Sequence, residues 1–242
     1  MAQEDKLPLS QRIVFEDNHV LVVNKTSSEL VQGDKTGDPS ILDELKKLIK
    51  ERDQKPGNVF LGLVHRLDRP TSGLVIVAKT SKALSRLTGA FRDRLVSKDY
   101  LVITEKGPEG PDLSLEPKGL MEDLLGRNEK TNTSKVVAAG GQEARLEYEL
   151  IQTLDSYLVW QVRLDTGRHH QIRVQFASRG FPVRGDLKYG ARRSIPGGGI
   201  GLHAWRLDFP HPTRGERRVV LTADPTKSQS DPLWKQVECP GP

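Results

Sequence analysis

Short apolar runs separated by polar turns, together with two amphipathic stretches, shape the first hundred residues of the chain. The run IVFEDNHVLVVNK predicts two strands around a polar turn at residues 16–18, and the unbroken apolar stretch 20–23 indicates a strand covered on both faces. The stretches DPSILDELKKLIKERD and TSKALSRLTGAFRDRLVSK carry apolar side chains at helical spacing, so each predicts a helix, the second capped by Thr80 or Ser81. Further strand-like runs occupy residues 61–64, 74–78 and 99–104.

Hairpins dominate the second half of the chain. The segments ARLEYELIQTL and YLVWQVRL alternate apolar and polar residues on either side of an Asp-Ser turn, and LHAWRLDF and RRVVLTA predict a second hairpin. Between them, HHQIRVQFASRG predicts a short helix that ends at Gly180, which suits a left-handed cap. Residues 107–119, rich in proline and glycine, predict a loop.

This order of elements predicts the fold class. Strands joined mostly by hairpins, with helices inserted between some of them, indicate an α+β fold with a mainly antiparallel, mixed sheet flanked by helices. No linker in the sequence clearly divides the chain. We therefore expect one domain over residues 10–225 and a peripheral C-terminal tail over residues 226–242.

Composition narrows the class of protein. The 242 residues are enough to bury a real core, and no apolar run approaches the length of a membrane span. The N-terminal stretch MAQEDKLPLSQR is acidic and polar, where a signal peptide would be basic and then apolar. The single cysteine, Cys239, excludes a disulfide framework and a cysteine-based metal site. We therefore expect a cytoplasmic protein with no membrane partner.

Positive charge is concentrated in one segment. Residues 163–193 hold eight Arg or Lys against two Asp, a segment charge of +6, although the whole chain carries only +5. A basic excess confined to one segment is typical of a polyanion-binding protein, and a solvated surface stretch is the alternative. In the first case, Arg179, Arg184 and Lys188 would contact phosphate groups.

The stretch HRLDRPTSG, residues 65–73, places one carboxylate between two arginines at the mouth of an apolar run. Either Asp68 forms a surface ion pair in a turn, or it is an active-site carboxylate held ionised by cations. The chain has no GxxxxGK[ST] phosphate loop, and the adjacent His169 and His170 have the wrong spacing for two metal ligands on one helix face. We therefore expect a reaction carried by a carboxylate, with no metal and no organic cofactor.

Five segments, taken in order, resemble one family. HRLDRPTSGL resembles the signature of the RluA-type RNA pseudouridine synthases, and EDNHVLVVNK resembles the opening hairpin of that family. VSKDYL resembles its Lys-x-Tyr strand, DTGRHHQIRVQFASRGFPVRGDLKYG its Thr-Gly-Arg-x-His-Gln-Ile-Arg segment with the following Gly-Asp-x-x-Tyr-Gly, and GLHAWRLDFPHPTRGE its last hairpin. Together they cover roughly residues 12–224, and a chance match in five ordered segments is remote.

The resemblance implies a fold, a reaction and a set of site residues. It implies a pseudouridine synthase fold with an active-site cleft across the sheet, in which uridine is isomerised without a cofactor. It places the catalytic carboxylate on Asp68, a base-stacking ring on Tyr100 and the cationic partner of Asp68 on Arg173. Arg66 and Arg69, with Arg168, are implied to bind the RNA and hold the loop. His65, Thr71, Ser72 and Gly73 suit loop formation better than catalysis.

The expected partner is structured RNA, a transfer or ribosomal stem-loop, bound by a monomer. Too few residues precede the first strand for a small RNA-binding domain of the S4 type, so we expect the catalytic domain alone. The sequence departs from the family pattern in the stretch NKTSSELVQGD, where Thr26 and Glu29 stand in place of a usual proline and a nearby glycine. His169 and Gln175 also replace usual residues and could alter RNA contacts.

Two other functions fit parts of the sequence. An RNA-binding or RNA-chaperone protein of the same fold, without turnover, would not need Asp68, Tyr100 and Arg173 together. A carboxylate-dependent glycosidase acting on nucleosides would usually need a second acid at matched spacing, and these motifs contain no obvious one. The sequence leaves open which RNA is modified and whether Asp68 acts as nucleophile or base.

Overall fold

The computed structural model describes residues 7–34, 37–107 and 115–241. Within these ranges the chain forms three α-helices and eleven strands, with several 3₁₀ turns. Its contacts divide it into two compact units: unit 1 comprises residues 1–97, 204–230 and 242, and unit 2 comprises residues 98–203 and 231–241. A compact unit need not fold alone, so the expected single domain over residues 10–225 stays a prediction.

Unit 1 contains a strand layer with the order β1-β2-β4-β10, in which β3 also pairs with β4 and β11 with β10. The pairs β1/β2, β2/β4, β3/β4 and β10/β11 are antiparallel. Every residue of β2 and β4 is buried, which confirms that the apolar run 20–23 is covered on both faces. The strands are β1 (Ile13–Glu16), β2 (Val20–Lys25), β3 (Gly62–Leu63), β4 (Ser72–Ala78), β10 (Leu202–Pro210) and β11 (Arg218–Thr222).

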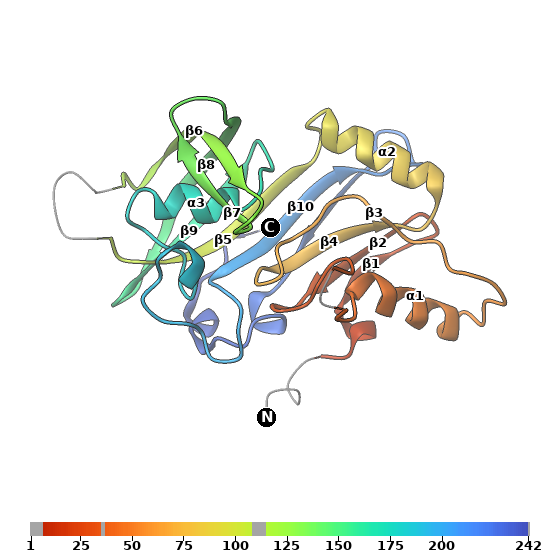
Figure 1. Cartoon of the computed structure of the whole chain (residues 1–242). Coiled ribbons are helices and arrows are strands. Elements are labelled where there is room, and N and C mark those ends of the chain that lie inside the picture. The colour runs from red at the N-terminus through yellow and green to blue at the C-terminus, as the bar shows by residue number, and fades with distance from the viewer. Residues whose placement is uncertain (1–6, 35–36, 108–114, 242) are drawn as a thin grey trace. The chain divides into compact units, whose positions relative to one another are not determined.

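Two helices of unit 1 lie where the sequence predicts them (Figure 1). Helix α1 (Ile41–Arg52) begins after Ser40, whose side chain accepts a hydrogen bond from the Asp43 N–H. Helix α2 (Ser81–Arg92) is capped by Thr80, which accepts from the Ala83 N–H at 3.1 Å, as predicted. The buried side of α2 packs into one apolar cluster with alternate residues of β2 and β4 and with Leu207 and Phe209 of β10.

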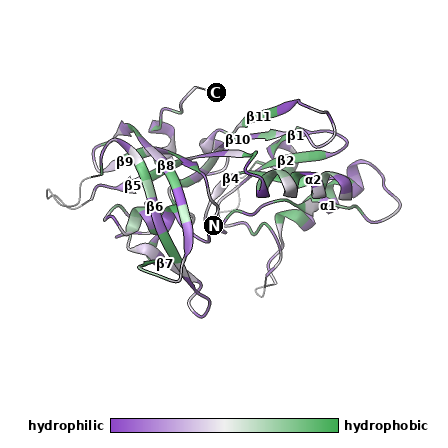
Figure 2. Cartoon of the chain, turned by 90° about the horizontal axis from the view of Figure 1, so that it is seen from above, coloured by the Kyte–Doolittle hydropathy of each residue, from purple (hydrophilic) through white to green (hydrophobic). Residues whose placement is uncertain are grey.

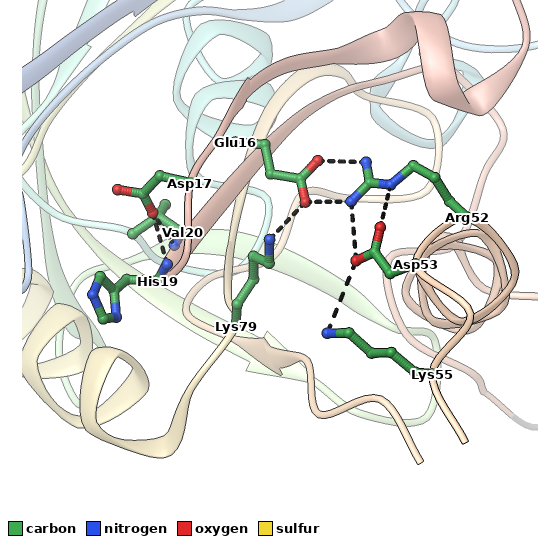
Figure 3. Close-up of polar contacts among 8 residues, drawn as sticks. All are labelled: Glu16, Asp17, His19, Val20, Arg52, Asp53, Lys55 and Lys79. Carbon is green, nitrogen blue, oxygen red and sulfur yellow. Dashed lines mark hydrogen bonds and ion pairs between the residues drawn. The ribbon is translucent and has the colours of Figure 1, made fainter. Parts of the chain in front are cut away.

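A charged cluster ties the first hairpin to the end of α1 and to the residue that follows β4 (Figure 3). Glu16, at the end of β1, accepts two hydrogen bonds from the Arg52 guanidinium at 2.7 Å and one from Lys79 Nζ at 2.6 Å. The hydrogen bonds and charge of Arg52, assisted by Lys79, outweigh partial burial and lower the pKa of Glu16 to about 2. The next residue, Asp17, accepts from the backbone N–H groups of His19 and Val20 and so closes the hairpin turn.

Unit 2 is an antiparallel strand layer with the order β5-β9-β8-β6-β7, and helix α3 (Gln171–Ala177) packs near β6 and β7. Its β8–β9 hairpin confirms the prediction, and the alternating burial along β8 matches the alternating colours of that strand in Figure 2. The strands are β5 (Ser97–Glu105), β6 (Lys118–Asn128), β7 (Thr133–Val137), β8 (Gln142–Thr153) and β9 (Tyr157–Leu164).

The sequence analysis missed the β6–β7 hairpin. Residues 108–114 of the predicted loop lie outside the described residues, but β6 begins at Lys118, inside the stretch assigned to that loop. Only Met121 and Leu125 are buried along β6, and their four-residue spacing gives no two-residue alternation. A strand with so few buried side chains carries a weak signal in the sequence.

Residues 231–241 of the predicted tail belong to unit 2 and are partly buried there. Trp234 is 1% exposed, its ring lies tilted 5.9 Å from the ring of His203, and the side chain of Asp231 pairs with Arg184 at 2.6 Å. The Arg184 guanidinium also lies over the Tyr157 ring, 4.4 Å from its centre. Part of the predicted peripheral tail is therefore anchored by a buried ring and an ion pair.

Helices, hairpins and the mainly antiparallel pairing confirm the predicted α+β class. Helix α3 ends near Gly180, which has a φ of 81°, in the left-handed region that the sequence predicts for a cap. None of the helices in the described ranges is long and apolar enough to cross a membrane.

Candidate active site

The turn that carries Asp68 is held at its start by His65. The Nε2 atom of His65 accepts a hydrogen bond from the Ile76 N–H at 3.1 Å, and its ring stacks on Phe91 with 5.0 Å between ring centres. The Thr71 N–H closes the turn by donating to the Asp68 carbonyl at 3.0 Å. These contacts give His65 the loop-forming role that the sequence predicts.

Gly73 ends the turn at a place where only glycine fits. Its φ is 113°, and a Cβ there would lie 2.3 Å from the carbonyl oxygen of Ala204 in β10. The sequence predicts a glycine-dependent turn at this position. The structure adds the physical reason, which is the close approach of a neighbouring backbone.

Lys25 lies beneath the turn and is fully buried. Its Nζ donates to three backbone carbonyls, those of Thr26 at 3.0 Å, Glu29 at 2.9 Å and Arg69 at 3.1 Å. The Ser28 N–H also donates to the Arg69 carbonyl at 2.9 Å. The segment after β2 therefore supports the residue that follows Asp68. Sequence reasoning did not single out Lys25, although a lysine at the end of an otherwise apolar strand was a usable signal.

Glu29, one of the departures from the family pattern, has a partner of its own. Its Oε2 accepts from Arg12 Nη1 at 2.7 Å and from the Thr26 N–H at 3.0 Å. Burial by itself would raise the pKa of Glu29, but the hydrogen bond and charge of Arg12 outweigh it and hold that pKa below its usual value. An ion pair and a capping bond thus fix the loop in which the family usually has proline.

The two arginines that flank Asp68 have different environments. Arg69 donates from Nε to the Ser28 carbonyl at 3.2 Å and pairs through Nη2 with Asp38 at 2.8 Å. Arg66 is exposed, and no described residue hydrogen-bonds or pairs with its guanidinium. Arg69 therefore helps to hold the loop, whereas Arg66 presents its charge to the surroundings.

Tyr100 belongs to unit 2, where it lies on β5 opposite Val162 of β9. Its side chain is 7% exposed. The preceding Asp99 accepts from Arg163 Nε at 2.8 Å. Burial lowers the pKa of Lys98, the lysine of the Lys-x-Tyr motif. A base-stacking role for Tyr100 stays a prediction.

Arg173 is buried in unit 2, on the first turn of α3. Its Nε and Nη2 donate to the two carboxylate oxygens of Asp186 at 2.6 and 2.9 Å, and both side chains are less than 5% exposed. The guanidinium also lies 5.0 Å from the centre of the Tyr189 ring. Two parallel hydrogen bonds fix the plane and direction of the guanidinium. Its predicted pairing with Asp68 stays a prediction.

Asp186 is the partner that sequence reasoning missed. It entered only as one of the negative charges of the basic segment and as a letter of the matched Gly-Asp-x-x-Tyr-Gly motif. Its place directly after Gly185, which has a φ of 81°, was the available signal, because a glycine-directed turn can aim a carboxylate inward.

The turn before α3 is linked to the β6–β7 hairpin. His170 has a φ of 55°, and its Nδ1 lies 2.7 Å from the Tyr189 hydroxyl, which accepts from the Ser134 N–H at 2.8 Å. His169 lies 2.9 Å from the Ser134 hydroxyl through its own Nδ1. Gln175 is buried and donates to Asp123 of β6 at 2.6 Å. These two departures from the family pattern make contacts within unit 2.

The basic segment 163–193 is largely paired. Arg168 donates from Nε to the Glu143 carbonyl at 2.8 Å. Arg179 pairs with Asp123 at 3.0 Å, and Arg184 pairs with Asp231. Only Lys188 of the three predicted phosphate contacts has no ion pair among the described residues; its Nζ donates to the Asn132 carbonyl at 3.2 Å. Arg179 and Arg184 thus have structural partners that the sequence did not reveal.

The predicted site residues fall into two groups. The turn in unit 1 brings together Arg66, Asp68 and Arg69, and unit 2 carries Tyr100, Arg168 and Arg173, of which Arg173 is joined by Asp186. Across the described part of the chain, no three His, Cys, Asp or Glu side chains are grouped so that they could hold a metal ion. A reaction without metal or organic cofactor stays a prediction.

Comparisons with known proteins identify relatives over most of the chain. The sequence model of the family described as RNA pseudouridylate synthase matches residues 19–178. The chain is 33% identical over 212 residues to the uncharacterized RNA pseudouridine synthase YlyB of Bacillus subtilis, covering 86% of this chain and 67% of that protein. It is 31% identical over 232 residues to ribosomal large subunit pseudouridine synthase D of Nitrosomonas europaea, covering 92% of this chain and 63% of that one.

Solved structures show the same fold. Human RNA pseudouridylate synthase domain containing 4 gives a TM-score of 0.73 at 22% identity, over 96% of each chain. Human RNA pseudouridylate synthase domain containing 1 gives a TM-score of 0.68 at 25% identity, over 87% of this chain and 82% of that one. The chain spans about two thirds of the length of the two curated relatives, 67% and 63%. The matched region contains the Asp68 turn, Tyr100 and Arg173. The chain therefore belongs to the RNA pseudouridylate synthase family, as its motifs predicted.

Proposed function

We propose that this protein isomerises specific uridines of structured RNA to pseudouridine, with Asp68 as the catalytic carboxylate. The observation that carries the proposal is the position of Asp68 in a rigidly built turn inside the matched family region. In this reaction the N1–C1′ bond breaks, the base rotates and a C5–C1′ bond forms; C5 loses its proton to the solvent and N1 takes one up, so the product is an isomer of uridine. Asp68 acts as nucleophile or base on the sugar.

The target base must leave its stack before it can rotate, which costs a few kcal/mol. Exposed cations that hold the flanking phosphates help to offset that cost. Arg66 suits this role, because its guanidinium is exposed and makes no ion pair within the described residues. We assign base stacking to Tyr100 and a substrate-binding role to Arg173, on the strength of the family motifs.

We propose ribosomal RNA as the substrate class. Several curated relatives are named ribosomal large subunit pseudouridine synthase D, which favours ribosomal over transfer RNA. A stem-loop suits recognition better than a regular duplex, because unstacked bases present their edges and faces to a protein.

Tritium release from RNA labelled at C5 of uridine tests this function. The purified protein is incubated with ribosomal and transfer RNA transcripts in the presence and absence of EDTA, and modified positions are mapped in the same samples. We expect stoichiometric release from one or a few uridines of the ribosomal transcript, unchanged by EDTA once the RNA is folded. Tight RNA binding without tritium release would contradict the proposal and indicate an RNA-binding protein without turnover.

A further inference from the structure

A pocket of about 280 Å³ opens beside the Asp68 turn, within unit 1. Its floor is apolar, formed by Leu30, Val31 and Leu67, each at most 9% exposed. Its rim is polar and exposed, and places the carboxylate-bearing Asp34 with Gln32, Arg66 and Arg69. Two of the lining residues, Leu67 and Arg69, are the chain neighbours of Asp68, the proposed catalytic residue.

The walls of this pocket are held in place by backbone contacts. On one side, Leu30 bridges to Ser40, and the Ile41 N–H donates to the Leu30 carbonyl at 2.8 Å, so that residue 30 is fixed to the start of α1. On the other side, the Ser28 N–H donates to the Arg69 carbonyl at 2.9 Å, and Arg69 Nε donates to the Ser28 carbonyl at 3.2 Å, so that the segment just before residue 30 is tied to the turn. A pre-formed pocket loses little ordering entropy when a ligand enters.

Size and chemistry select the occupant. Pockets for drug-sized ligands span roughly 300–1,000 Å³, so a volume near the lower bound suits one small ring system. An apolar floor with a guanidinium at the rim suits a flat heteroaromatic ring, because RNA-binding proteins stack unpaired bases on apolar, aromatic and guanidinium surfaces. The amide of Gln32 can both donate and accept hydrogen bonds at the edge of such a ring.

We propose that this pocket binds the base of an unpaired nucleotide adjacent in the RNA chain to the target uridine. This inference rests on the proposed function and names a specificity site for it. Residues 30–34 form one wall, directly after Glu29, one of the two departures from the family pattern in this stretch. The side chains of this wall and of the turn would set the preference for the neighbouring nucleotide.

Direct binding of nucleotides tests the pocket without turnover. The probes are the four nucleoside 5′-monophosphates and ribose 5-phosphate, titrated to millimolar concentrations into ¹⁵N-labelled protein. We expect at least one nucleotide to shift the amide signals of Gly33 and Leu67, and ribose 5-phosphate to leave them in place. Equal shifts with ribose 5-phosphate would mean an anion site and would overturn the proposal, as would no shift with any nucleotide.

Gly33→Leu adds a bulky side chain to a residue that lines the pocket. A Cβ at Gly33 meets no atom within 4 Å and its φ is not in the left-handed region, so a side chain can be added without strain. Gly57→Leu is the matched control, because Gly57 has the same open surroundings and lies outside the pocket. The nucleotide shifts should disappear in Gly33→Leu and persist in Gly57→Leu. Their persistence in Gly33→Leu would place the binding elsewhere.

Abasic substitutions in a modified RNA connect the pocket to specificity. Removing the base from each nucleotide adjacent to the target uridine should lower kcat/KM about tenfold at one position, because base stacking is worth that much or more. Gly33→Leu should show a similar loss on intact RNA and little additional loss on that abasic RNA. Fully additive losses would overturn the proposal. If no RNA is modified, the proposed function fails, and the nucleotide titration still decides whether the pocket binds a base.

Discussion

Two arginine-rich regions, the turn at residues 65–73 and the segment 163–193, look alike in sequence and differ in structure. In the turn, Arg69 pairs with the exposed Asp38, whereas Arg66 is exposed and makes no ion pair within the described residues. In the segment, Arg163, Arg173, Arg179 and Arg184 each pair with an aspartate. A high density of positive charge therefore does not tell whether arginines serve a polyanion or the fold. The position of the acids in space decides it.

These ion pairs bear on the prediction that Arg179 and Arg184 of the basic segment contact phosphate groups. The excess of +6 over residues 163–193 was counted along the chain, where only two acids lie within the segment. Two of the pairing acids, Asp123 and Asp231, come from β6 and from the C-terminal segment. We now expect the turn to carry more of the RNA contact per arginine than the segment does.

The largest expected effect concerns the carboxylate inside the turn. Asp68→Asn should lower turnover by more than about 10³-fold, roughly 4 kcal/mol of barrier, because an amide cannot act as the nucleophile or base. Tritium release measures this effect, and RNA binding should stay within a factor of a few. Asp155→Asn, in an exposed turn, is the control and should leave activity unchanged. Residual activity within tenfold of the wild type would remove Asp68 from the catalytic role.

The next largest effect concerns the buried pair of the segment. Asp186→Ala should lower the free energy of unfolding by about 3–5 kcal/mol, because it leaves the buried Arg173 guanidinium without this carboxylate. Urea denaturation measures the change. The control is Glu149→Ala, which breaks the exposed pair with Lys118 and should cost at most about 0.5 kcal/mol. Equal costs for the two variants would show that the buried pair stabilises the fold no more than an exposed pair does.

The charged cluster around Glu16 contains an arginine that serves the fold, and the pH dependence of stability tests this role. Because its folded-state pKa of about 2 lies below the usual 4.5, Glu16 adds stability above pH 4.5, and this contribution is lost as pH falls toward 2. Allowing for solvent screening, we expect a contribution of about 1–2 kcal/mol. Glu16→Gln should flatten the acid limb of a stability–pH curve measured by urea unfolding. An unchanged limb would show that Arg52 and Lys79 do not stabilise the ionised Glu16.

The smallest expected effect is on the salt dependence of RNA binding. Arg66→Ala should reduce the slope of log K against log salt by about 0.7–0.9, the value for one lost phosphate contact. Arg179→Ala should leave the slope nearly unchanged, since this guanidinium already pairs with Asp123. A binding titration at several salt concentrations measures both. A larger slope change for Arg179→Ala than for Arg66→Ala would show that the basic segment, and not the turn, makes the phosphate contact.

Local patterns explain why much of the fold could be predicted. The helix caps at Thr80 and Gly180 and the alternation along β8 depend on nearby residues, and all three are where the sequence predicts them. The β6–β7 hairpin was missed because its packing depends on a few side chains that contact α3 and the strand beside it. Its pattern carries no local period.

The candidate site divides in the same way. The Asp68 turn could be recognised from a continuous motif, and its glycine from the chemistry of tight turns. The partners of Lys25 in unit 1 and of Arg173 in unit 2 could not be predicted, because Lys25 meets Arg69 across 44 residues and Arg173 meets Asp186 across a loop. The pocket beside the turn combines residues 30–34 with residues 66–69, two segments that no single motif joins.

The buried Nζ of Lys25 resembles a coordinated cation, because it donates hydrogen bonds to backbone carbonyls. Three carbonyl oxygens at 2.9 to 3.1 Å surround its Nζ much as carbonyls surround a dehydrated alkali cation in a channel filter. Here the cation is covalently attached to the chain, so it cannot be dialysed away or exchanged for another ion. The loop next to Asp68 thus keeps this amino group in place, whatever the ionic composition of the surrounding solution.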